Sequence, residues 1–308
     1  MSCDVAMLYP SWFQLTGKFA VALTRGPLLA LLAVYFIQWV LHQHFSHLDT
    51  IAGMPRDMAL FVLGTMFVHS ATYFVVAGSL TMCSLQGWLK QYEMPRTARM
   101  IPSRQLLRAT ILKALFGQLI TSPIVLVLLF YYKIVQLGSV TVALPPWYIL
   151  WKQLALSIFF NELLFYIAHR TLHEVPFLYR TIHKQHHKYV GTVAIAAEFA
   201  NPFEDAFANQ ISTSFYCFAA GVPLPVWLAW LFWRLFETYE GHSGFCFRET
   251  WFCKVGLLNS EKVLFHDFHH TENKGNYGSH LFDLLFGTAD AFLIHQRRER
   301  EQQVEKKL

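Results

Sequence analysis

Residues 58–83, MALFVLGTMFVHSATYFVVAGSLTMC, form a run of 26 residues that contains no Lys, Arg, Asp or Glu. A helix needs about 20 mostly apolar residues to cross the hydrocarbon core of a bilayer. This run is long enough to cross a membrane with some tilt. It therefore predicts a membrane-spanning helix and an integral membrane protein.

The composition of the whole chain agrees with a membrane protein. Of its 308 residues, 54% are hydrophobic and only 15% are charged, whereas soluble domains average about 45–50% apolar and 25% charged residues. The formal net charge of +5 is modest, and we expect no nucleic-acid partner.

Neither a disulfide framework nor a leader peptide is expected. The N-terminal stretch MSCDVAMLYPSWF lacks a basic region before a short apolar core, so we predict no cleaved signal peptide. The five cysteines contain no Cys-x-x-Cys pair, and we expect reduced thiols at Cys3, Cys83, Cys217, Cys246 and Cys253.

Further apolar stretches predict three more spanning helices and one hairpin. The spans are residues 26–41, extended back through FAVALT, residues 111–132, with a kink at Pro123, and residues 147–168. Residues 211–236 are also apolar, but GVPLP interrupts them and leaves each half short. We therefore predict a re-entrant or buried helical hairpin there.

Charges predict the orientation of these helices. The connection 90–113 holds six Lys and Arg residues and one acid, Glu93, so by the positive-inside rule it faces the cytosol. The prediction is an all-α protein with four spans, both termini cytosolic, and a cytosolic, histidine-rich helical module at about 162–295. We divide the chain into an N-terminal membrane region (1–110), a catalytic region (111–295) and a polar tail (296–308).

Nine of the fifteen histidines follow a pattern. The segments HRTLH, HKQHH and HDFHH each carry histidines three or four residues apart, and a further histidine lies in EGHSG. Positions i, i+3 and i+4 share one face of a helix, so each segment can aim two or three imidazoles at a common point. Imidazole is the commonest metal ligand. The candidate ligands are His169, His173, His183, His186, His187, His242, His266, His269 and His270.

The number of histidines bears on the number of metal ions. A single histidine in a membrane protein is usually a core or interfacial residue, but two triplets of identical spacing with an i,i+4 pair are not expected by chance. Nine imidazoles exceed the needs of one ion, whereas two ions with four or five each fit. Carboxylates nearby could ligate, orient the imidazoles or be plain solvated charges: Glu162, Glu198, Glu204, Asp205, Glu240 and Asp267.

Three longer stretches carry a family resemblance. HRTLHEVPFLYRTIHKQHH, RLFETYEGHSGF and HDFHHTENKGNYGSHLFDLLFGTAD resemble the fatty acid hydroxylase/sterol desaturase superfamily and, within it, the C4-methylsterol monooxygenase group, over about residues 161–290. The resemblance implies an O₂-dependent, non-haem di-iron monooxygenase of the endoplasmic reticulum membrane, with two Fe ions. It also implies electrons from NAD(P)H through cytochrome b5 or a separate reductase, and oxidation of a sterol, at its C4-methyl group.

Two positions depart from the pattern of that group. Asn201-Pro202 stands where relatives often have His-Pro, and Cys246 follows HSGF where they often have Asp or His. Both triplets and the pair are intact, which favours an active enzyme. Behind the ligands, we predict supporting roles for Glu162, Asn201, Asp267 and Asp283.

The remaining histidines are given other roles. We expect His42, His44 and His47 to be interfacial residues across the membrane from the main cluster, and His69 to pack in the bundle. Aromatic residues of the hairpin (215–233) and Phe159, Phe160 and Phe165 are candidates for the wall of a lipid site.

Two alternative functions stay open. One is another lipid oxidase of the superfamily, such as a fatty acid or sphingolipid hydroxylase or a sterol C5-desaturase. The other is a non-catalytic membrane protein that binds or transports metal. A transporter should hold its ligands near the midplane of spanning helices, whereas the histidine segments here lie beyond the fourth predicted span.

Overall fold

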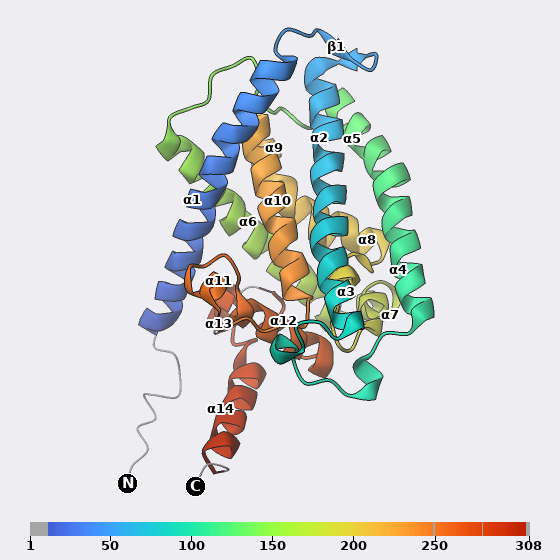
Figure 1. The fold of residues 1–308 in the computed structure, drawn as a ribbon, viewed down its shortest axis with the longest axis vertical. Coiled ribbons are helices and arrows are strands. Elements are labelled where there is room, and N and C mark those ends of the chain that lie inside the picture. The colour runs from blue at the N-terminus through green and yellow to red at the C-terminus, as the bar shows by residue number, and fades with distance from the viewer. Residues whose placement is uncertain (1–11, 249, 279, 306–308) are drawn as a thin grey trace.

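The structure is a computed structural model that describes residues 12–248, 250–278 and 280–305. The described chain is mostly helical, and its strands are the two-residue pair β1 (Thr50–Ile51) and β2 (Met54–Pro55) (Figure 1). The predicted all-α class is confirmed. Cys3 and most of the stretch examined for a signal peptide lie outside the described residues.

Long helices that run along the long axis of the molecule form a bundle (Figure 1). Two of them are continuous through a wider π turn. The long helices are α1 (Trp12–Phe45); α2 (Arg56–Thr72) with the π segment Tyr73–Ala77 and α3 (Gly78–Gln86); α4 (Arg104–Phe116) with the π segment Gly117–Thr121 and α5 (Ser122–Tyr131); and α6 (Trp147–Glu174). Short 3₁₀ turns at Lys90–Tyr92 and Ala98–Met100 join α3 to α4.

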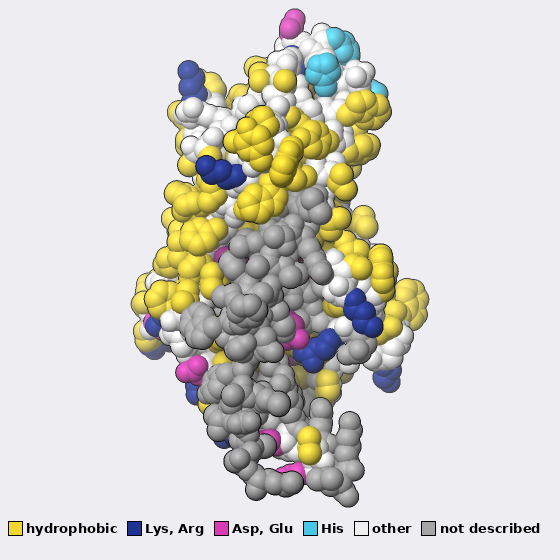
Figure 2. Space-filling view, turned by 90° about the vertical axis from the view of Figure 1, so that its left-hand side faces the viewer, with side chains coloured by type: hydrophobic (Ala, Val, Ile, Leu, Met, Phe, Trp, Pro, Cys, Tyr) yellow, Lys and Arg dark blue, Asp and Glu magenta, His cyan; other side chains and the backbone are white. Residues whose placement is uncertain are grey.

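Two of the described helices are long and apolar enough to cross a membrane, namely Arg56–Gln86 and Ala98–Tyr131. They contain the predicted span 58–83 and all but the last residue of the predicted span 111–132. Leu29–Phe45 in α1 is a shorter apolar helix, and α6 covers the predicted fourth span without meeting the same test. The face drawn in Figure 2 shows a broad band of hydrophobic side chains. The chain is thus a helical membrane protein, and the four crossings stay a prediction.

The predicted kink at Pro123 takes the form of a π turn. Proline has no backbone N–H and its ring crowds the preceding turn of a helix. The widened turn Gly117–Thr121 ends just before Ser122 and Pro123, the first residues of α5. The helix thus accommodates the proline by a local change of pitch.

The predicted hairpin is present, and the first half of its second arm is buried in the bundle. Its first arm runs through α8 (Pro202–Glu204), a π segment (Asp205–Gln210) and α9 (Ile211–Ala219), and its second arm is α10 (Leu224–Gly241). Every residue from Leu224 to Leu231 is buried, and α10 packs against α1, α2 and α6. A helix that is apolar on all sides belongs in the centre of a bundle, which explains why this segment does not lie on the surface.

The histidine-rich segments lie at one end of the bundle, near the C-terminus (Figure 1). They belong to α6, the end of α10, the 3₁₀ segment His183–Lys188 and α12 (Ser260–Glu272). The other elements of this region are α7 (Pro176–Thr181), the 3₁₀ segment Ala194–Glu198, α11 (Trp251–Lys254), α13 (His280–Leu285) and α14 (Asp290–Glu305). The predicted tail, from residue 296, is the continuation of α14. The four described cysteines, Cys83, Cys217, Cys246 and Cys253, are free thiols.

Candidate metal centre

All nine histidines singled out in the sequence come together in two groups. Within each group the ligand nitrogens lie within 4.8 Å of one another. The five-histidine group is built from α6, the 3₁₀ segment and α12, and the four-histidine group from the 3₁₀ segment, the end of α10 and α12. The groups are His169, His173, His183, His187 and His269, and His186, His242, His266 and His270.

Each triplet is divided between the two groups: two of its imidazoles meet at a common point, as the spacing allowed, and the third joins the other group. In HKQHH, His183 and His187 join the five-histidine group, and His186 joins the other. In HDFHH, His266 and His270 join the four-histidine group, and only His269 crosses over. The i and i+4 side chains stay together, and the i+3 side chain points to the neighbouring group. The two triplets therefore link the groups reciprocally.

Backbone carbonyls fix the orientation of four imidazoles. Nδ1 of His169 donates to the carbonyl of Tyr277 (2.8 Å), and Nδ1 of His269 donates to that of Gly275 (2.6 Å). In the other group, His242 donates to Thr238 (2.8 Å) and His270 to Tyr189 (2.9 Å); every carbonyl can only accept a hydrogen bond. The proton of each neutral ring is thus on Nδ1, and the Nε2 lone pair is directed into the group.

Nε2 atoms face one another across short distances. In the five-histidine group, Nε2 of His183 lies 3.0 Å from those of His169 and His187. In the other, Nε2 of His266 lies 2.8 Å from that of His242 and 3.1 Å from that of His270. Nitrogens held about 2.1 Å from one ion, at right angles to each other, are about 3.0 Å apart.

The donor set fits a metal ion in each group. Nε2 of His269 is buried and has no hydrogen-bond partner among the described residues. Converging lone pairs repel one another unless a cation or proton lies between them. The geometry therefore suits two cations, one surrounded by five imidazoles and one by four.

Burial keeps these imidazoles neutral. Desolvation lowers the pKa of all three histidines in the 3₁₀ segment, and the charges of neighbouring histidines lower it further. Burial likewise lowers the pKa of His269 to about 4. Because a protonated ring has no lone pair for a metal, a depressed pKa leaves the ligands available at neutral pH.

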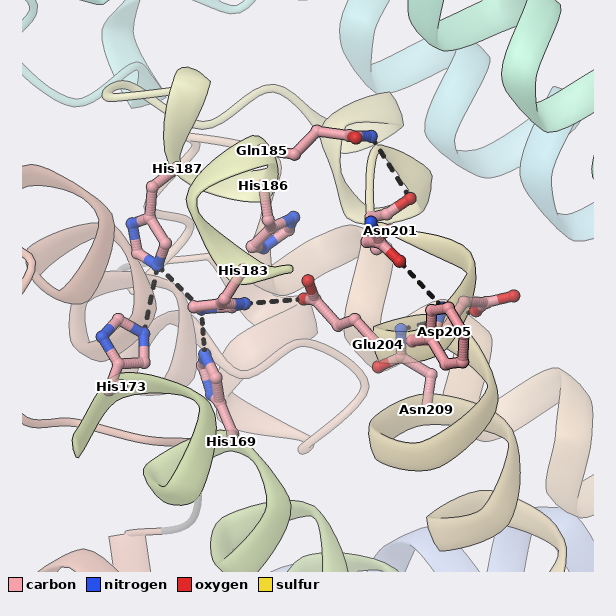
Figure 3. Close-up of polar contacts among 12 residues, drawn as sticks. His169, His173, His183, Gln185, His186, His187, Asn201, Glu204, Asp205 and Asn209 are labelled. Carbon is pink, nitrogen blue, oxygen red and sulfur yellow. Dashed lines mark hydrogen bonds and ion pairs between the residues drawn. The ribbon is translucent and has the colours of Figure 1, made fainter. Parts of the chain in front are cut away.

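Glu204 supports one ligand from behind. Its Oε1 lies 2.9 Å from Nδ1 of His183, and the pair is almost fully buried (Figure 3). Burial, followed by the charge of Asp205, raises the pKa of Glu204, and a metal cation bound to His183 would oppose this shift and favour the ionised carboxylate. A carboxylate in this position orients an imidazole and makes it a stronger ligand. Glu204 was one of several carboxylates in the sequence, and only the fold distinguishes it.

Asn201 caps a helix and is not placed as a metal ligand. Its side chain accepts a hydrogen bond from the backbone N–H of Phe203 (3.0 Å) and so caps α8 (Figure 3). It belongs to neither histidine group. The cap fixes the start of the helix that carries Glu204, so the structure relates Asn201 to the site through Glu204.

Asp283 organises the loop that orients two ligands. Its carboxylate is fully buried and accepts from the backbone N–H groups of Tyr277 (2.8 Å) and Gly278 (3.1 Å) and from the hydroxyl of Thr288 (2.6 Å). The same loop presents the carbonyls of Gly275 and Tyr277 to His269 and His169. Asp283 thus holds the carbonyls rather than the imidazoles.

The other predicted supporting residues lie in neighbouring contacts. Glu162 and Glu237 each lie 3.4 Å from the ammonium group of Lys262, on α12. Asp267 accepts a hydrogen bond from the hydroxyl of Thr192 (3.1 Å). Neither Glu162 nor Asp267 belongs to the two histidine groups.

The remaining sequence candidates lie outside the groups. His42, His44 and His47 are at the β1 end of the molecule, far from the histidine-rich end (Figures 1 and 2). His69 contacts Glu198 in the bundle. The backbone N–H of Cys246 donates to the carbonyl of Tyr92 (2.7 Å).

Two surface pockets adjoin this end of the molecule. An apolar pocket of about 400 Å³ is lined by Phe232, Trp233, Phe236, Phe252, Leu257 and Leu258. Of the predicted hairpin aromatics, Phe232 and Trp233 line it. A second pocket, of about 370 Å³, is lined by Tyr179, Arg180, Thr181, Lys184, Gln185, His187 and Lys188, so basic side chains surround the exposed edge of the five-histidine group.

Comparison with known proteins agrees with this histidine framework. A sequence model described as fatty acid hydroxylase matches residues 154–288. A putative methylsterol monooxygenase of Dictyostelium discoideum is 30% identical over 76% of this chain and 85% of its own length. The chain belongs to the fatty acid hydroxylase family. It is similar to that family's methylsterol oxidase group, as the sequence predicted.

Other relatives carry two different activity names. Methylsterol monooxygenase 1 of Gallus gallus is 27% identical over 79% of this chain and 81% of its own length. A very-long-chain aldehyde decarbonylase of Oryza sativa is 27% identical over 75% of this chain and 86% of its own length. No solved structure matches. These similarities make the chain a lipid-oxidising enzyme of the membrane and leave its substrate open.

Proposed function

We propose that the two groups hold two iron ions and that the protein is an O₂-dependent monooxygenase that oxidises the C4-methyl group of a sterol. The observation that supports this most is the pair of imidazole groups with inward-facing Nε2 atoms. Bound iron would supply the O₂ chemistry that unactivated C–H bonds require. The similarity to methylsterol monooxygenases supports a sterol as the substrate.

The chain's own residues would prepare the site for this reaction. Nine neutral imidazoles add no negative charge, so the two cations keep their full electrophilic character. The carbonyls of Gly275, Tyr277, Thr238 and Tyr189 hold the rings in place. The four-histidine group is fully buried, which would exclude bulk water from a reactive centre.

We further propose four membrane crossings, with the histidine groups and both termini in the cytosol at the endoplasmic reticulum. The basic connection 90–113 supports this orientation. Substrate would enter from the bilayer, and the apolar pocket beside Trp233 is a candidate route. Electrons from NAD(P)H would arrive through cytochrome b5 or a reductase, for which the basic rim around Lys184 and Lys188 is a suitable face.

The first test is a sterol profile, by mass spectrometry, of cells that lack the protein, before and after it is restored. We expect 4-methyl or 4,4-dimethyl sterols to accumulate and to clear on rescue. An unchanged sterol profile with a shift in hydroxylated or desaturated fatty acids or sphingolipids would favour another lipid oxidase. A shift in long-chain aldehydes would favour the activity named for the rice relative, and no lipid change would contradict an oxidase.

A further inference from the structure

A second polar centre lies inside the bundle, outside the two histidine groups. Nε2 of His69 lies 2.8 Å from Oε1 of Glu198, and Nε2 of Gln118 donates to Oε2 of the same carboxylate (2.9 Å). The hydroxyl of Tyr239 also donates to Glu198. Four elements therefore meet at one carboxylate: α2, the π segment after α4, the 3₁₀ segment Ala194–Glu198 and α10.

Two polar atoms in this centre have no partner among the described residues. They are the hydroxyl oxygen of Tyr73 and the amide oxygen of Gln118, and their side chains are 1% and 3% exposed. Tyr73 follows His69 by one helical turn, and its ring centroid lies 5.7 Å from that of Tyr239. Both side chains belong to the surroundings of Glu198, Gln118 through its own hydrogen bond and Tyr73 through the ring of Tyr239. Since buried polar groups are almost always hydrogen-bonded, two unpartnered atoms in one centre indicate a ligand.

Three π segments lie around this polar centre. Tyr73 begins one π segment, and Gln118 lies in another. Asp205 begins a third, and its carboxyl lies close enough to Glu198 and His69 to be affected by their charges. Single π turns inside α-helices occur frequently at functional sites, because they turn side chains that a regular helix would aim elsewhere.

The place of this polar centre in the bundle and its hydrogen-bonding groups indicate which kind of molecule it would bind. His69 and Gln118 belong to the two helices that are long and apolar enough to cross a membrane, and the side chains of His69 and Glu198 are 29% and 17% exposed. A ligand from the bilayer can thus reach them. An amide oxygen accepts a hydrogen bond, and a tyrosine hydroxyl donates or accepts one. An alcohol offers both, whereas a carboxylate would be repelled by Glu198 and Asp205.

We propose that Tyr73 and Gln118, beside the His69–Glu198 pair, bind the hydroxyl group of a neutral membrane lipid. This inference deepens the proposed function and rests on it, because it describes how the oxidase holds its substrate. Tyr239 lies three residues before His242 on α10, about 5 Å along the helix axis. A lipid anchored here by its hydroxyl would be oxidised near the hydroxyl-bearing carbon, not at a distant chain end.

Equilibrium binding to the full-length, metal-loaded protein in nanodiscs tests this proposal. The probes are cholesterol, its methyl ether, and oleic acid. We expect the native protein to bind cholesterol at least 10-fold more tightly than the ether or the acid. Tyr73→Phe and Gln118→Leu should each weaken cholesterol binding about 5- to 10-fold, the loss expected for one hydrogen bond. Gln118→Leu should leave ether binding unchanged, because the ether has no O–H to donate to the Gln118 amide oxygen.

The variants separate binding from folding. Tyr73→Phe removes a hydroxyl that has no protein partner among the described residues, so its fold should be as stable as the native one. Tyr216→Phe, on α9, is the matched control and should bind cholesterol normally. Equal affinity for cholesterol and its ether would overturn the proposal. So would variants that alter only thermal stability, as expected if the centre holds water, or oleic acid that binds as tightly as cholesterol.

Metal content and turnover, measured on the same samples, keep the two proposals apart. Turnover is assayed with a 4,4-dimethyl sterol, because cholesterol has no C4-methyl group to oxidise. Selective cholesterol binding without any oxidation of that sterol would contradict the proposed function and leave the binding site standing. Oxidation without any preference for cholesterol over its ether would contradict the binding site and leave the proposed function standing.

Discussion

The imidazole of His183 shows how a residue that holds no metal can set the quality of a ligand. Glu204 lies behind His183; the His183 side chain is 0% exposed and the Glu204 side chain is 6% exposed. In such surroundings a carboxylate interacts strongly with the ring it faces, because little water screens the contact. The ligand strength of His183 therefore depends on a residue in another element.

We expect Glu204→Gln to weaken metal retention. Glutamine keeps the shape and can still accept from Nδ1, but it loses the negative charge that raises ligand basicity. The expected loss is about 10- to 100-fold in metal affinity, measured by elemental analysis after dialysis against a graded chelator. Glu174→Gln, which changes a half-exposed carboxylate paired with Arg170, should retain metal normally. Equal retention by both variants would show that Glu204 has no such role.

A second test at the scale of residues uses His186 and His269, the i+3 histidines that join the group opposite to the rest of their triplet. His186→Ala leaves three imidazoles in the smaller group, and His269→Ala leaves four in the larger. Both variants should lose oxidation and still insert into the membrane, and His186→Ala should lose more metal because fewer ligands remain. His42→Ala, at the opposite end of the molecule, is the control for both. Normal turnover by either variant would refute the ligand assignment.

Residue types in the sequence predicted which histidines come together as candidate ligands but not what orients them. The nine histidines are recognisable by spacing, and the structure brings all nine together. Four of their Nδ1 partners are backbone carbonyls, such as those of Gly275 and Tyr189, and any residue type supplies a carbonyl. The Thr238 carbonyl is local to His242, 4 residues away, but the other three carbonyls lie 6, 81 and 108 residues from their rings. Which of these faces which ring depends on how distant segments pack, so spacing alone cannot reveal it.

At the scale of elements, the loop between α12 and α13 shows why particular residues occur where they do. Asn273, Gly275 and Asn276 all have positive φ, at 53°, 61° and 54°. Glycine and asparagine adopt this conformation most readily. The run NKGN in the sequence thus encodes a tight turn, and this turn delivers the Gly275 carbonyl to His269.

We expect Gly275→Ala to disturb the metal site, unlike Gly287→Ala. Both glycines have positive φ, but a Cβ at Gly275 would lie 2.2 Å from the carbonyl oxygen of Thr288, whereas at Gly287 the nearest atom is 3.8 Å away. Both substitutions carry the strain of a left-handed backbone, about 1–3 kcal/mol. Only Gly275→Ala should also displace the carbonyl that orients His269. Metal content and thermal unfolding of the two variants would separate these effects, and equal metal content would contradict the argument.

The helices were predictable because each depends on a local run of apolar residues. The division of each histidine triplet between the two groups depends instead on segments that are distant in the chain. Apolar runs of sufficient length predicted α2–α3 and α4–α5, and the GVPLP interruption predicted the hairpin. The segment HKQHH was expected to use helical spacing but is a 3₁₀ turn, with His183 and His187 aimed one way and His186 the other. That outcome depends on where α12 and α10 lie, and short sequence windows contain no such information.

At the scale of the whole molecule, each group joins segments that are distant in the chain. The five-histidine group connects α6, the 3₁₀ segment and α12, and the four-histidine group adds the end of α10. Repulsion among inward-facing lone pairs disfavours this assembly without a cation. Metal binding and the packing of the histidine-rich end should therefore be thermodynamically coupled.

Metal removal should consequently destabilise the protein as a whole. A ligand that binds only the folded state stabilises it by about 2.7 kcal/mol when its free concentration is one hundred times its Kd. We expect chelation to lower the unfolding temperature of the purified, full-length protein by several degrees and restored Fe(II) to recover it. In His186→Ala the recovery should be smaller, because one group has lost a ligand. An unfolding temperature that does not respond to metal would mean that the imidazoles are held by packing alone, and the converging Nε2 atoms would then need another explanation.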